Sequence, residues 1–222
     1  MHFKNAVIAG ALSVCGSVAF AQEFTGGTLG LEYTAFDGAN GTSYDAGVEF
    51  SINRQIGTQL DIEHATGGGD SASSATFHGI YHLSNTSSVG AFYGQNLGGD
   101  LDYTTYGIEG GTLLWGRSNF GGYLGQQQFD GGSSFILGVN AETPLSESFE
   151  VYSDFDFALV DDVWVSTSEV GEQYSPCNGP ELFAHFGSLS AGAGGATAST
   201  EYLGVGARIN FGARRGTTFE GR

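Results

Sequence analysis

The chain has 222 residues, a length that suits one domain or one barrel. It carries 24 acidic residues against 7 lysines and arginines, for a formal net charge of −17 at pH 7. Nucleic-acid binding is excluded, because phosphate contacts need Lys and Arg side chains. The sequence holds 2 cysteines, Cys15 and Cys177. Only Cys177 lies beyond the N-terminal export segment, so the mature chain has no internal disulfide.

The first residues have the features of a secretory signal peptide. Lys4 supplies a positive charge, Ala6–Val14 is a short apolar run, and Ala19–Ala21 is a small-x-small cleavage site. We therefore expect residues 1–21 to be a signal peptide and residues 22–222 to be the mature protein. No window is long and apolar enough for a transmembrane helix. If the mature protein lies in a membrane, it has to be a closed barrel.

The mature sequence alternates between apolar and polar residues with a period of two, which is typical of β-strands with unlike faces. Tyr44–Asn53 and Glu201–Gly212 are the clearest runs. Turn-forming residues separate the runs. The predicted fold class is all-β, a transmembrane antiparallel up-and-down β-barrel of about ten strands, within a range of roughly eight to twelve. The expected strands are residues 28–36, 44–53, 58–63, 76–83, 89–96, 105–114, 120–129, 134–142, 149–159 and 201–212.

The segment from about residue 160 to residue 199 is predicted to be a long external or plug loop. It contains Pro176, Cys177 and Pro180, and a short helix is expected near Glu181–Phe186. Long connections of this kind are usually functional or disordered.

The predicted connections alternate in kind along the chain. Those after the even-numbered strands are short, and two of them carry Arg54 and Arg117. Outer-membrane barrels have short periplasmic turns and longer external loops. The Gly-rich connections after the odd-numbered strands are therefore expected to be external, and they carry Asp37, Asp70, Asp100, Asp102, Asp130, Asp161 and Asp162.

Alternation alone does not decide which face of the strands meets water, since a secreted soluble β-domain shows the same pattern. The predicted apolar faces contain no charged residue, which a lipid-facing surface requires. Aromatic residues also lie near the expected strand ends, as in the girdles of membrane barrels. These girdle candidates are Phe36, Tyr44, Trp115, Phe120, Phe135, Phe149 and Phe211.

The last predicted strand carries a short motif, Gly-x-x-apolar-x-aromatic, at Gly206, Ile209 and Phe211. With this motif the chain resembles Gram-negative outer-membrane β-barrel proteins of the small porin-like family. The resemblance implies location in the bacterial outer membrane, contact with outer-membrane lipid and lipopolysaccharide, and recognition of the motif by the barrel-assembly machinery. In that family the motif normally ends the chain, whereas here Gly212–Arg222 follows it.

If the apolar face points outward, the polar face lines the lumen. Rings of Asp and Glu favour cations, so the sequence predicts a small passive, cation-favouring porin-like channel for small cations or solutes. A narrow barrel can also be filled by side chains, and the alternative is a closed structural or adhesive barrel that presents residues 160–199. The predicted pore-lining residues are Glu32, Asp45, Glu49, Asp61, Glu63, Glu109, Glu142, Glu150, Asp154, Asp156 and Arg208.

No cofactor is predicted, apart from Ca²⁺ or Mg²⁺ loosely bound at the Asp-bearing connections, where oxygen ligands suit hard cations. An enzyme is not expected. His82-Leu83-Ser84 resembles the His-x-Ser element of lipid A deacylases, but Ser84 lies at the predicted periplasmic end, and no Gly-x-Ser-x-Gly is present. His82 is therefore expected to be a lumen residue, His64 a residue near the outer rim, and His185 a loop residue.

Overall fold

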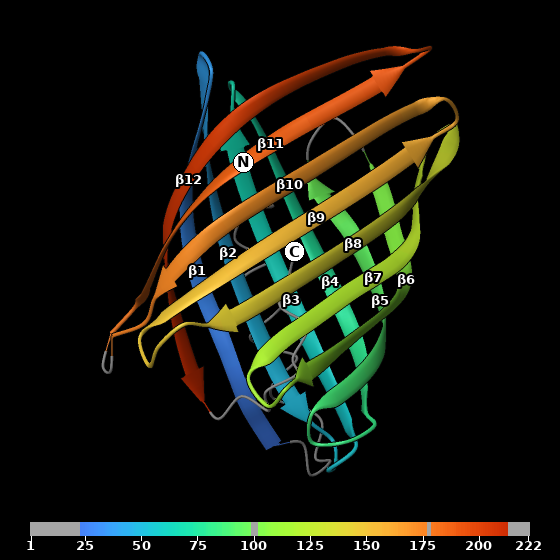
Figure 1. The fold of residues 1–222 in the computed structure, drawn as a ribbon. Helices are drawn as coiled ribbons and strands as arrows, with labels where there is room; N and C mark the ends of the chain where they lie inside the picture. The colour runs from blue at the N-terminus through green and yellow to red at the C-terminus, as the bar shows by residue number, and fades with distance from the viewer. Residues whose placement is uncertain (1–22, 99–101, 177–178, 213–222) are drawn as a thin grey trace, which may run out of the picture.

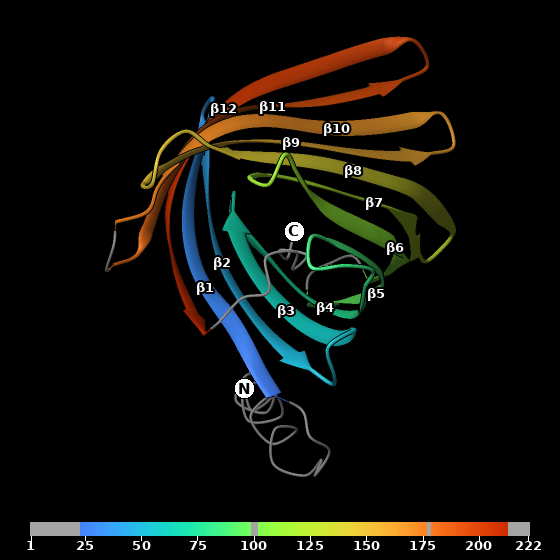
Figure 2. The ribbon, with the colours of Figure 1, turned by 60° about the horizontal axis from the view of Figure 1, so that its bottom comes forward.

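The computed structural model describes residues 23–98, 102–176 and 179–212. These residues form 12 antiparallel strands, each paired with its neighbours in sequence, and β1 pairs with β12 to close the barrel (Figures 1 and 2). In the described part of the chain, no helix is long and apolar enough to cross a membrane. The strands are β1 Glu23–Phe36, β2 Ala39–Ser51, β3 Ile56–Gly67, β4 Asp70–His82, β5 Ser87–Gly98, β6 Tyr103–Leu114, β7 Ser118–Phe129, β8 Gly132–Pro144, β9 Phe149–Val160, β10 Val163–Tyr174, β11 Glu181–Ala193 and β12 Ala196–Gly212.

The predicted fold class is confirmed, but the strand count is 12 rather than about ten. The segment predicted to be a loop at residues 160–199 instead forms β10 and β11, and the helix expected near Glu181–Phe186 is also wrong. β10 pairs in unbroken register with β9 on one side and β11 on the other. This pairing satisfies the backbone hydrogen bonds that a membrane-spanning segment must bury.

The two ends of the barrel differ in their connections. At the end that carries the Asp residues, most turns have two residues, such as residues 37–38, 68–69 and 130–131. Gly38 and Gly131 there have positive φ angles of 79° and 96°, which glycine adopts without steric cost. The prediction that the Asp-bearing connections are longer than those at the other end is therefore wrong. Residues expected in these connections instead belong to the strands on either side. The Asp residues do lie at one end of the barrel, opposite the end where β1 begins and β12 ends, and Asp100 lies outside the described residues. They are Asp37, Asp70, Asp102, Asp130, Asp161 and Asp162.

The exterior of the barrel is apolar. Large apolar side chains face outward from strands around the whole barrel, among them Leu31, Phe77, Ile108, Val139 and Leu203. By contrast, the hydrophobic side chains buried inside are few, whereas many polar ones are buried. This inside-out distribution fits lipid as the surrounding solvent rather than water.

Aromatic rings gather near the end where the chain enters and leaves the barrel. Phe24 packs against Phe50 and Phe211, with ring centroids 5.9 and 6.0 Å apart. At the same end of the barrel, the ring centroids of Phe149 on β9 and Tyr174 on β10 are 5.0 Å apart. Such rings match the interfacial girdle of a transmembrane barrel. The predicted signal peptide and the residues after Gly212 lie outside the described part of the chain.

Candidate functional site

The inner wall encloses a central cavity of about 290 Å³. A wider space of about 790 Å³, which we call the vestibule, lies at the Asp-turn end. Glu32, Glu63 and Glu169 line both spaces, so they mark the junction between them. The ionisable side chains of the central cavity are Glu32, Asp45, Asp61, Glu63, Glu142, Glu150, Asp154, Asp156, Glu169, His185 and Arg208.

Most of the predicted pore-lining residues therefore lie in the wall of the central cavity. The other two, Glu49 and Glu109, are on the inner wall of the barrel but do not line this cavity. Glu49 is only 4% exposed, and the Glu109 side chain is tied to His78. Glu169 and His185 also line the cavity; neither was predicted to do so, because both lie in the segment predicted to be a loop.

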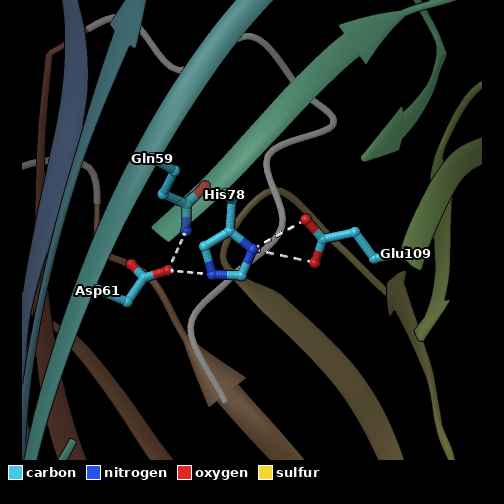
Figure 3. Close-up of polar contacts among 4 residues, drawn as sticks. All are labelled: Gln59, Asp61, His78 and Glu109. Atoms are coloured by element: carbon cyan, nitrogen blue, oxygen red, sulfur yellow. Dashed lines mark hydrogen bonds and ion pairs between the residues drawn. The ribbon is translucent and has the colours of Figure 1, made fainter. Parts of the chain in front are cut away.

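His78 forms the centre of a buried polar cluster on β3, β4 and β6 (Figure 3). Its Nε2 lies 3.0 Å from Asp61 Oδ2, and its Nδ1 lies 2.8 and 3.0 Å from the two oxygens of Glu109. Gln59 Nε2 donates a hydrogen bond of 2.8 Å to the same Asp61 oxygen. Each ring nitrogen therefore lies within 3.0 Å of a carboxylate oxygen. The doubly protonated imidazolium suits this arrangement, because it carries a proton on both nitrogens. The cluster thus favours a cation between two of the predicted lumen carboxylates.

Beside this cluster, side chains of β4 and β5 fill the interior toward the chain-terminus end. Ile80 is 2% exposed, and His82 Nδ1 lies 2.7 Å from Ser88 Oγ. Ser84 instead contacts Thr86, with 3.2 Å between their hydroxyl oxygens. His82 and Ser84 therefore do not form a catalytic pair, and His82 is a buried interior residue as expected.

His185 is central to a second cluster, on the opposite side of the barrel. Its side chain is 3% exposed, and Nδ1 lies 3.0 Å from the Tyr152 hydroxyl. Nε2 points between two carboxylates, 3.5 Å from Glu32 Oε1 and 3.7 Å from Glu169 Oε2. The prediction of a loop position for His185 is wrong, because its strand β11 lies in the barrel wall.

Hydroxyl groups orient both carboxylates of this second cluster. Thr34 Oγ1 donates a hydrogen bond of 2.7 Å to Glu32 Oε1. The Tyr202 hydroxyl donates one of 3.0 Å to Glu169 Oε2. Glu32, Glu169 and His185 are therefore held in place by neighbours, and we call these three residues the His185 site.

Inward-facing aromatic and imidazole rings lie against glycines on the neighbouring strand. At each of these glycines a Cβ atom would collide with the ring, so no other residue leaves room for it. Arg208, the cation that the described chain places in the cavity wall, lies over the Phe183 ring at 5.5 Å. The ring–glycine pairs are Tyr152 with Gly171, Phe183 with Gly206, His185 with Gly204, and Tyr202 with Gly187.

Comparisons with known proteins identify the fold. The chain matches no known family profile and no curated protein sequence. Among solved structures, it aligns with the KdgM porin at a TM-score of 0.66 and 10% identity, over 83% of this chain and 99% of that chain. The KdgM porin in complex with disordered oligogalacturonate gives 0.64 and 9%, over 83% and 99%. The NanC porin gives 0.64 and 8%, over 82% and 98%.

This likeness concerns the fold. Together with the apolar exterior, it defines the class of protein: a membrane-spanning β-barrel with the porin fold. Closed barrels of this kind are outer-membrane structures.

Proposed function

We propose that the protein is a small passive channel of the bacterial outer membrane, and that its acidic lumen favours cations. The observation that carries this proposal is the charge of the central cavity. Its wall holds nine carboxylates, from Glu32 to Glu169 in the chain, with Arg208 as the arginine among them. Acidic walls of this kind attract cations and repel anions.

The pairing of the strands supports a hydrated or cation-filled lumen. Asp45 is directly opposite Glu63 across β2 and β3, and Asp154 is directly opposite Glu169 across β9 and β10. Like charges at directly opposite positions destabilise a sheet. Water or passing cations in the lumen would relieve this repulsion, whereas a dry lumen would increase it.

The comparison with porins supports a difference in solute charge. One solved structure of this fold is described as a complex with oligogalacturonate, which is an anion. The wall of the present cavity is strongly acidic. We infer that this chain uses the same barrel for solutes of the opposite charge, and that it acts as a channel rather than as an enzyme.

Solute uptake by liposomes that contain the refolded mature protein tests this function. Swelling should be fast with a cationic solute, slower with a neutral one and slowest with an anionic one of similar size. Equal rates for the three solutes would contradict a charge-selective lumen. No uptake by a correctly inserted barrel would contradict an open channel.

The alternative was a closed barrel that presents residues 160–199 as an external loop. Most of that segment forms β10 and β11, so it is not available as such a loop. Across the described ranges, no three His, Cys, Asp or Glu side chains are grouped to hold a metal ion. Loose Ca²⁺ or Mg²⁺ binding at the Asp turns stays a prediction. Contacts with lipopolysaccharide and with the barrel-assembly machinery also stay predictions.

A further inference from the structure

The His185 site brings together hydrogen-bond acceptors from three strands. Glu32 comes from β1, Glu169 from β10 and His185 from β11. The distances from His185 Nε2 to the two carboxylates, 3.5 and 3.7 Å, are too long for hydrogen bonds. Nε2 is buried and makes no hydrogen bond in the structure. Two carboxylate oxygens thus lie within 3.7 Å of an imidazole nitrogen that makes no hydrogen bond.

The side chains of the His185 site are held in place by their neighbours. Thr34 and Tyr202 each fix one carboxylate, and Tyr152 fixes the imidazole. The rings of Tyr152 and Tyr202 stand edge-on to the imidazole, with centroids 6.4 and 5.8 Å away. Acceptors oriented in advance bind a ligand with less loss of side-chain entropy.

We propose that the His185 site binds the primary ammonium group of an organic amine, and thus selects the solute of the proposed channel. A primary ammonium group has three N–H donors and no acceptor, and the site offers three neighbouring acceptors: Nε2 of His185 and the carboxylates of Glu32 and Glu169. In the bound state His185 carries its proton on Nδ1 and donates it to the Tyr152 oxygen. Nε2 then accepts from the ammonium group, and Glu32 and Glu169 neutralise its charge.

The site suits an ammonium group better than a hard metal ion. Ca²⁺ needs about six to eight oxygen ligands, and Mg²⁺ needs near-octahedral geometry. In the described part of the chain, no three His, Cys, Asp or Glu side chains are placed to hold a metal ion. An ammonium group needs only three acceptors, and the remainder of the amine needs room. The central cavity and the vestibule provide this room, because Glu32 and Glu169 border both spaces.

Further carboxylates extend from the site along the wall. Asp154 is directly opposite Glu169, and Asp156 follows two residues later on the same face of β9. Residues two apart on one strand face are separated by about 6.6–6.8 Å. A linear diamine held by one ammonium group at the His185 site therefore has further carboxylates along the wall for its second ammonium group.

Calorimetric titration of the refolded mature barrel in detergent tests the inference without relying on conduction. The probes are 1,4-diaminobutane and glucosamine, which distinguish linear amines from amino sugars. Tetramethylammonium is the control ligand, because it has the charge but no N–H donor. The two amines, or one of them, should bind at least about tenfold more tightly than tetramethylammonium, as expected for charge-assisted hydrogen bonds. Equal binding of all three ligands would overturn the proposal.

Substitutions locate the binding. Glu169→Gln and Glu32→Gln should each weaken amine binding by about tenfold, because one charged acceptor becomes neutral. The matched control is Glu172→Gln on the same strand, since Glu172 is exposed on the outer face. It should leave the affinity unchanged. An equal loss in Glu172→Gln would place the binding outside the His185 site.

His185→Phe tests the role of the imidazole, because it keeps the ring and removes Nε2. Amine binding should weaken several-fold if Nε2 is an acceptor. Stronger binding would show that His185 acts as a competing cation, and would overturn the assignment.

The inference rests on the proposed channel, but the two can fail separately. A barrel that conducts K⁺ without preferring amines overturns the inference alone. A barrel that binds amines but never conducts overturns the channel alone.

Discussion

Inner-wall rings and glycines are matched across neighbouring strands, and this pairing shapes the His185 site at the level of single residues. A Cβ atom at Gly204 would collide with the His185 ring. We expect Gly204→Ala to push the imidazole out of place and to lower the free energy of unfolding by about 1–3 kcal/mol, as overpacking does. Urea titration of the barrel in lipid vesicles measures the change.

Gly79→Ala is the matched control, because the nearest atom to a Cβ there is a backbone oxygen at 4.0 Å. It should be close to neutral. Equal losses at Gly204 and Gly79 would mean that the His185 ring does not need this space.

His78 is the second residue whose replacement should be costly. His78→Gln removes the cation between two buried carboxylates, whose side chains are 12% and 6% exposed in Asp61 and Glu109. Breaking a buried ion pair on one side costs about 3–5 kcal/mol. We expect His78→Gln to reduce the free energy of unfolding by an amount in this range, and Glu109→Gln in the same chain to restore part of it.

His64→Gln is the control for this prediction. The His64 ring contacts Ser73 and Tyr44 but no carboxylate. A small loss is expected there. If both histidine variants lost the same stability, the His78 cluster would not be a charged cluster.

The strands show how far local sequence patterns can predict this fold. Alternation predicted most strands, because large apolar residues mark their outer faces. β10 and β11 were missed because Ser166, Ser168, Ser188 and Ser190 lie at outward positions and break the apolar pattern. Their place in the sheet depends on pairing with β9 and β12, which no local window contains.

The candidate site was predictable to a similar degree. Period-two alternation was enough to place the acidic residues of the recognised strands on the inner wall. The contacts of His78 with Asp61 and Glu109 join three different strands, and sequence spacing does not show which inward residues meet. The His185 site was missed with the strands that carry Glu169 and His185.

The outer face of β10 allows a test of whether this strand spans the membrane. Val170 is 58% exposed on its outer face. Val170→Arg should cost about 2–4 kcal/mol near the membrane midplane and less toward the interface. Thr167→Arg on the inner face is the control, since Thr167 lines the vestibule. The heat-dependent gel shift of folded barrels measures both; an unfavourable effect of Thr167→Arg alone would contradict this placement of β10.

The strand that closes the barrel, β12, allows a second test. Phe211 stacks on Phe24 at the terminus end, and Gly206, Ile209 and Phe211 are the predicted assembly signal. Phe211→Ala should lower the folded fraction in cell membranes more than it lowers refolding in vitro. Leu203→Ala on the same strand face is the control. Equal losses in both settings would assign Phe211 a packing role only.

At the scale of the whole molecule, the barrel combines an apolar exterior with an acidic interior. Buried side chains at the His78 cluster lie beside the central cavity, so the space between the strands is narrower than the barrel itself. A solute in this space would pass close to the acidic wall, so passage should depend on charge among solutes of similar size.

The most direct test of this account is the zero-current potential of refolded residues 22–222 in a planar bilayer under a KCl gradient. We expect discrete conductance steps and a potential of the sign that marks preference for K⁺ over Cl⁻. The preference should decrease when Asp154, Asp156 and Glu169 are replaced by their amides. An anion-selective potential, or an inserted barrel that never conducts, would contradict the acidic channel.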